Sequence, residues 1–98
     1  MPRIPLSDLP QTGARIFDLD GKRVLICRSA AGIRAMHEIC PHQHLSLDGA
    51  RIRGNAIMCP HHGARFSLED GKSLSPLTPD GLTLFATRQL GDELEIDL

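Results

Sequence analysis

The chain has 98 residues, three cysteines and a formal net charge of −1 at neutral pH. This length predicts a single domain, residues 1–98, which is small enough for a bound cofactor to contribute to its stability. A charge near zero argues against a nonspecific nucleic-acid binder, so we expect protein partners. The sequence contains neither an apolar run of bilayer length nor a signal-peptide core after Met1, so we expect a cytoplasmic protein without a membrane partner.

Short segments of β-type residues alternate with turn residues along the whole chain. This alternation predicts an all-β domain. The turns include Asp20–Gly21, Gly54–Asn55 and Gly91–Asp92, and Asp-Gly is a strong hairpin signal. In chain order, the predicted strands are 14–19, 22–28, 33–39, 51–53, 56–58, 65–68, 73–74, 84–89 and 93–97.

Two motifs carry the chemistry of the chain. Cys-x-His occurs at residues 40–42 and, after sixteen intervening residues, Cys-x-x-His occurs at residues 59–62. One type of [2Fe–2S] centre has two cysteine thiolates on one iron and two histidines on the other. Two loops that each supply one ligand to each iron satisfy this requirement. The motifs therefore predict that Cys40 and Cys59 hold one iron and that His42 and His62 hold the other.

Two other kinds of site remain open for the same residues. Two cysteines and two histidines also form the tetrahedral ligand set of structural zinc, although zinc fingers usually place a cysteine pair before a histidine pair. A cysteine–histidine nucleophile is a second alternative, but the sequence indicates neither an orienting group nor a substrate pocket.

These motifs resemble those of the Rieske ferredoxins that serve bacterial aromatic-ring dioxygenases. The similarity begins near Ala35, continues through Gly63, Phe66 and Pro76, and reaches the acidic C-terminal segment 91–98. It implies an antiparallel Rieske-like β-sandwich with a small cluster-binding subdomain, about residues 40–76, made of two ligand loops. It also implies one Rieske-type [2Fe–2S] cluster, with a proline-containing segment at Pro76 covering it.

The resemblance implies an electron carrier that is not itself an enzyme. Its expected partners are a flavoprotein reductase and a Rieske-type terminal oxygenase, both transient, in the catabolism of aromatic hydrocarbons. We expect a monomer. A fixed small subunit of a larger oxidoreductase, similar to that of assimilatory nitrite reductase, and a zinc-stabilised interaction module are the alternatives.

Several neighbouring residues carry secondary expectations. Cys27 lies in an apolar β-type run and is expected to be a buried, unreactive thiol. His61 is expected to be a surface neighbour of the ligand His62, and Gly63 to point its amide toward a cluster sulfur. High-potential Rieske proteins carry a disulfide between the loops, where this chain has Leu45 and His61, so we expect a low reduction potential.

Charged residues on two strands allow either of two interpretations. Arg51 and Arg53 share one face of a short strand, where they steer a partner or are simply solvated. The alternating acids Glu93, Glu95 and Asp97 either steer a partner or protect an exposed strand edge.

Overall fold

The computed structural model describes residues 2–9, 11, 13–29, 32–40, 45–61, 63–75 and 80–98. The predicted ligands Cys40 and Cys59 lie within these ranges. The predicted ligands His42 and His62, and the predicted cover residue Pro76, lie outside the described residues.

Strands dominate the described residues, which contain a single 3-10 helix, η1 (Leu6–Asp8), and no α-helix. No helix in this part of the chain has the length and apolar character needed to span a membrane. The strands are β1 (Arg3–Pro5), β2 (Gly13–Leu19), β3 (Lys22–Ser29), β4 (Gly32–His37), β5 (Ile39–Cys40), β6 (Leu45–Ser46), β7 (Arg51–Arg53), β8 (Ala56–Met58), β9 (Arg65–Ser67), β10 (Leu84–Leu90) and β11 (Glu93–Asp97).

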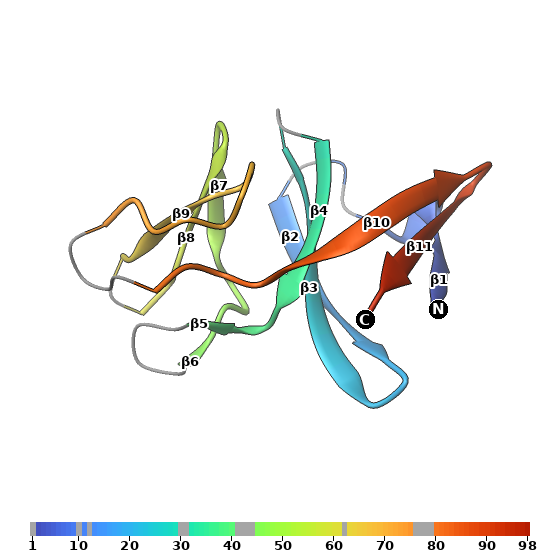
Figure 1. Ribbon diagram of the computed structural model, residues 1–98, viewed down its shortest axis with the longest axis horizontal. Coiled ribbons are helices and arrows are strands. Elements are labelled where there is room, and N and C mark those ends of the chain that lie inside the picture. The colour runs from blue at the N-terminus through green and yellow to red at the C-terminus, as the bar shows by residue number, and fades with distance from the viewer. Residues whose placement is uncertain are drawn as a thin grey trace.

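The largest unit is a curled six-stranded antiparallel sheet in the order β1-β11-β10-β4-β3-β2 (Figure 1). Its β2–β3 hairpin closes at Asp20 and Gly21, with φ of 54° and 83°. Positive φ at both central residues is the type I′ geometry that matches the twist of the flanking strands. The local sequence therefore fixes the register in which Leu19 pairs with Lys22.

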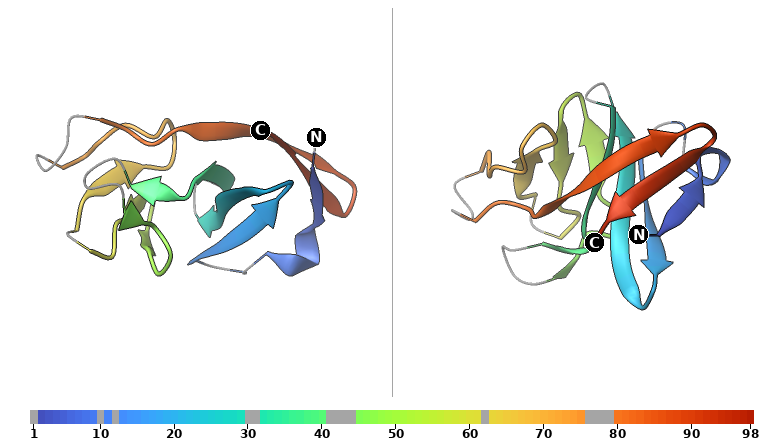
Figure 2. Two further views of the ribbon diagram at one scale, coloured as in Figure 1. Left: turned by 90° about the horizontal axis from the view of Figure 1, so that it is seen from below. Right: turned by 45° about the vertical axis from the view of Figure 1, so that its right-hand side comes forward.

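Two smaller sheets lie at the end of the molecule opposite the chain termini, as Figures 1 and 2 show. One sheet has the order β7-β8-β9, and the other pairs β5 with β6. The pairing of β5 with β6 places Cys40 opposite Leu45, and β8 ends directly before Cys59. Both predicted cysteine ligands therefore belong to this end of the fold.

Two hydrophobic cores lie on the two faces of strand β3, because successive side chains of a strand point to opposite faces. Leu25 and Cys27 belong to the core that also contains Cys40 and Cys59, which we call the ligand-side core. Val24 and Ile26 belong to the second core, which we call the terminal core because both ends of the chain contribute to it.

The all-β class predicted from the sequence is confirmed. One predicted strand, 33–39, is divided by a bend at Glu38, after which the chain leaves the large sheet and pairs with β6. The predicted strand 73–74 is reduced to an isolated bridge between Phe66 and Ser73. Strand β1 and the β5–β6 pair were not predicted, because segments of two or three residues carry no measurable periodicity and these lack a tight-turn signal such as the Gly54–Asn55 that marks β7 and β8.

Candidate metal centre

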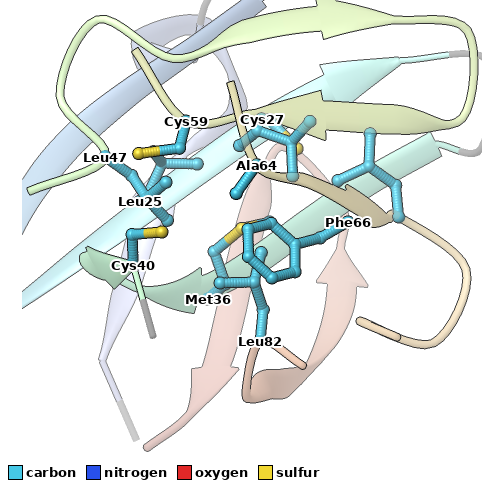
Figure 3. Close-up of a cluster of buried hydrophobic side chains, with 11 residues drawn as sticks. Leu25, Cys27, Met36, Cys40, Leu47, Cys59, Ala64, Phe66 and Leu82 are labelled. Atoms are coloured by element: carbon cyan, nitrogen blue, oxygen red, sulfur yellow. The ribbon is translucent and has the colours of Figure 1, made fainter. Parts of the chain in front are cut away.

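The two cysteines predicted as ligands lie in one buried cluster. Cys40 is 1% exposed and Cys59 is 3% exposed. Figure 3 shows both on the same side of the ligand-side core, with Leu25 and Leu47 beside them. No disulfide joins any of the three cysteines. The fold thus brings two thiols from separate loops into a water-poor site, where thiolates can bind a metal cluster.

The first loop is fixed at its base by the buried side chain of Glu38. One carboxylate oxygen accepts a hydrogen bond of 2.7 Å from Ser46 Oγ, and the other lies 2.9 Å from Arg23 Nε. The Glu38 carbonyl also accepts a bond of 2.7 Å from the Leu47 amide. A buried carboxylate needs such partners to offset its lost hydration. These contacts connect the chain just before Cys40 with the chain just after Leu45, and so hold the two ends of the first ligand loop together.

The second loop closes on itself around Cys59. Its amide donates to the Ala64 carbonyl at 2.8 Å, and its carbonyl accepts from the Gly63 amide at 3.1 Å. The Gly63 amide is thus a donor within the turn, and the expectation that an amide near Gly63 points toward a cluster sulfur stays a prediction. Gly63 has a φ of 75°, and a Cβ there would meet Met58 Sδ only at 4.0 Å. Backbone conformation, rather than space, requires glycine at this position.

A hydrogen bond connects the two loops. His61 Nε2 lies 3.1 Å from the Ser46 carbonyl oxygen, to which it donates in the Nε2-protonated tautomer. His61 is exposed, as predicted, but it is not merely a neighbour of the ligand. This link and the Glu38–Ser46 contact were not predicted from the sequence. Nothing in the local pattern signals a bond between a histidine and a backbone carbonyl fifteen positions away.

The close contact between Gly71 and Gly81 brings together the chain on either side of residues 76–79. The Leu82 amide donates to the Gly71 carbonyl at 2.7 Å. A Cβ on Gly81 would lie 2.5 Å from that same carbonyl oxygen, and a Cβ on Gly71 would overlap the Leu82 carbonyl. Two residues without side chains are needed for the backbones to approach this closely.

The third cysteine, Cys27, is a buried thiol with 1% exposure. Burial raises its pKa from the ordinary value of 9.0 to about 11, and the hydrogen bond and charge of Arg34 offset only part of this effect. A raised thiol pKa means that the folded protein favours the neutral form. The stability gained from this preference is fully present below about pH 9 and is lost as pH rises through about 11.

We expect Cys27 in the folded holoprotein to react with a disulfide reagent such as DTNB at pH 8 at least about a hundredfold more slowly than free cysteine. A pKa two units above normal reduces the thiolate fraction about a hundredfold, and burial blocks access further. Thiol titration of native and urea-unfolded protein measures the difference, with Cys27→Ala as the blank. Rapid labelling of native protein that Cys27→Ala abolishes would contradict this assignment.

These features define a small all-β protein with two thiol-bearing loops that converge at one end of the fold. The sequence matches the Rieske [2Fe-2S] domain family over residues 1–85. The chain belongs to this family, and its cofactor is one Rieske-type [2Fe–2S] cluster. The buried pair Cys40 and Cys59 suits the thiolate-bound iron of such a cluster.

Known relatives are ferredoxin components of oxygenase systems. The 3-phenylpropionate/cinnamic acid dioxygenase ferredoxin subunit of Escherichia coli (strain K12) is 29% identical over 96 residues, covering 96% of this chain and 89% of that protein. This match agrees with the family resemblance seen in the sequence. An electron-carrier role fits the family and these relatives.

Solved structures show the same fold. The ferredoxin of carbazole 1,9a-dioxygenase from Nocardioides aromaticivorans IC177 has a TM-score of 0.84 at 23% identity, covering 95% of this chain and 91% of that one. A carbazole dioxygenase ferredoxin in complex with its oxygenase gives a TM-score of 0.82 at 22% identity, covering 95% and 96% of the two chains. The terminal oxygenase from Novosphingobium sp. KA1 also matches, with a TM-score of 0.82 at 18% identity over 98% of this chain but 28% of that one. The fold alone therefore does not separate a carrier from an oxygenase domain.

Proposed function

We propose that this protein is a cytoplasmic, monomeric one-electron carrier that passes electrons from a flavoprotein reductase to the terminal oxygenase of an aromatic-ring dioxygenase. The observation that carries the proposal is the buried Cys40–Cys59 pair, in a chain that covers nearly the full length of a ferredoxin subunit. Residues 1–98 form one domain, and the cluster-binding part is about residues 40–76.

The ligand assignment follows the two loop motifs. Cys40 and Cys59 hold the inner iron, and His42 and His62 hold the outer iron. The cluster supplies one-electron redox chemistry. The side chains of the chain bind and orient it: Glu38 fixes the first loop, and the bond from His61 to the Ser46 carbonyl ties the second loop to the first.

Apolar residues at the cluster end support brief docking to a partner. The large apolar side chains that are exposed among the described residues are Leu45, at 39%, and Leu74, at 52%. Leu45 follows the first ligand loop directly, and Leu74 precedes the segment that contains Pro76. Small, partly apolar interfaces are typical of transient electron-transfer complexes.

The first test is the visible spectrum and the low-temperature EPR spectrum of the dithionite-reduced protein. The chain has no Trp and no Tyr, so its near-ultraviolet and visible absorption should come almost wholly from the cluster. A low average g value, typical of histidine-ligated iron, together with reoxidation by a purified terminal oxygenase, would support the proposal. Stable co-purification as a fixed subunit of a larger enzyme would favour the nitrite-reductase-like alternative. A colourless zinc protein would contradict both.

We expect a reduction midpoint near the lower end of the Rieske range, which spans roughly −150 to +300 mV. Ala64 and Phe66, which follow the second loop, are fully buried and carry no hydroxyl group to donate to the cluster. Ala64→Ser should raise the midpoint by tens of millivolts. A hydrogen bond contributes about 1 kcal/mol, and a tenfold change in a one-electron equilibrium corresponds to about 59 mV. Spectroelectrochemical titration of both proteins checks this, and a clearly positive wild-type midpoint would contradict it.

A further inference from the structure

Three arginines share the outer face of the sheet formed by β7, β8 and β9. In the register of this sheet, Arg51 pairs with Met58, and Met58 pairs with Arg65. Arg53 pairs with Ala56 in the adjacent outward row. The row between them, Ile52, Ile57 and Phe66, packs against the ligand-side core. Because side chains alternate between faces, the arginines point away from the core, and all three are exposed.

None of these arginines has an acidic partner within the protein. All twelve Asp and Glu residues of the chain lie in its described part, and none forms an ion pair with Arg51, Arg53 or Arg65. Other arginines do find carboxylates: Arg3 and Arg88 bind Glu95, and Arg23 binds Glu38. The sheet therefore presents a local cluster of three uncompensated positive charges on a molecule whose formal net charge is −1.

The cluster of charges lies next to the second ligand loop. Met58, which stands between Arg51 and Arg65, directly precedes Cys59. The Cβ position of Gly63 in that loop is 4.0 Å from Met58 Sδ. The acidic turn Glu69–Asp70 lies at the other end of the sheet, where Glu69 accepts a hydrogen bond from Asn55. The acidic turn thus lies near Arg53, whereas Arg51 and Arg65 flank the residue before the ligand loop and form no ion pair with an acid.

We propose that this arginine face, Arg51, Arg53 and Arg65, is an interaction surface for an acidic patch on the terminal oxygenase. The inference rests on the proposed function and adds the side of the domain on which the partner is recognised. Arginine suits this role because its guanidinium binds carboxylates in a bidentate manner. Charges beside the cluster steer the encounter over about a Debye length and orient the ligand loops toward the partner. The oxygenase is favoured over the reductase because a ferredoxin of this fold forms a solved complex with an oxygenase.

The test measures the second-order rate at which purified terminal oxygenase reoxidises the reduced holoprotein, between 20 and 500 mM NaCl. The variants are Arg51→Glu and Arg65→Glu. Lys22→Glu is the control. It makes the same charge change at an exposed position beside the β2–β3 turn, in the six-stranded sheet. We expect each arginine variant to lower the low-salt rate about fivefold and to flatten its salt dependence, while Lys22→Glu follows wild type. Unchanged visible and EPR spectra would show that the cluster itself is intact.

The outcomes separate the two proposals. If wild type transfers electrons but the arginine variants match Lys22→Glu, or if the effect appears only with the reductase, the docking surface is wrong and the carrier role stands. A wild-type rate that rises with salt would also overturn the docking surface. If the wild-type holoprotein transfers no electron to the oxygenase, the proposed function itself fails.

Discussion

Replacing either Cys40 or Cys59 with serine should yield a protein without its [2Fe–2S] cluster. Each thiol is almost fully buried, and each would supply one of the two thiolates on the inner iron. Serine has nearly the same size but is a poor ligand for iron. We expect iron and acid-labile sulfide to fall below about a tenth of the wild-type content, with loss of the reduced EPR signal.

Cys27→Ser is the matched control, since Cys27 is equally buried but is not a predicted ligand. It should retain the cluster while losing about 1–2 kcal/mol of stability, the typical cost of a buried hydroxyl group. A second pair of variants distinguishes the roles of the two adjacent histidines. We expect His62→Ala to lose the cluster and His61→Ala to keep it. Full cluster content in Cys40→Ser or Cys59→Ser, or its loss in Cys27→Ser, would refute the ligand assignment.

Gly81→Ala should lower the free energy of unfolding by about 2–3 kcal/mol. The added methyl group would lie 2.5 Å from the Gly71 carbonyl oxygen, which is a backbone atom and accepts the hydrogen bond from Leu82. Overpacking against a fixed group typically costs about 1–3 kcal/mol, and breaking a backbone hydrogen bond adds to this loss. Urea unfolding followed by far-ultraviolet circular dichroism measures the change.

Gly91→Ala provides the comparison for this variant. Gly91 has a φ of 62°, but a Cβ there would meet no atom within 4 Å. Its replacement costs only the strain of a left-handed conformation, about 1 kcal/mol. Equal losses for the two variants would show that the contact between Gly71 and Gly81 relaxes at little cost, and that close approach does not explain the two glycines.

The hairpins and the cysteine pair were predictable because their signals are local. Asp20–Gly21 and Gly54–Asn55 specify tight turns, and the strands that flank each of them pair as predicted. The spacing of cysteine and histidine in each loop predicted Cys40 and Cys59 as ligands, an assignment that stays a prediction. The fold confirms that these two lie together in the core. The roles of His42 and His62, which lie outside the described residues, stay predictions.

Contacts between distant residues were beyond the reach of sequence patterns. The alternating acids of strand β11 were compatible with a strand at the exposed edge of a sheet. In the structure, however, β11 lies between β1 and β10. Its Glu95 is buried and forms ion pairs with Arg3 and Arg88. Likewise, the sequence around Glu38 did not indicate that its carboxylate would accept a hydrogen bond from Ser46 across the first ligand loop. Each of these interactions depends on how the sheets curl, and no short window of sequence encodes that curvature.

The division of the interior by strand β3 has a consequence for how the protein matures. The terminal core contains Val24, Ile26, Leu94 and Ile96 but none of the cysteines, so it can form without iron. The ligand-side core, by contrast, contains both thiols that are predicted as ligands, Cys40 and Cys59. We therefore expect the apoprotein to retain the packing of the terminal core, and cluster binding to stabilise mainly the ligand-side core.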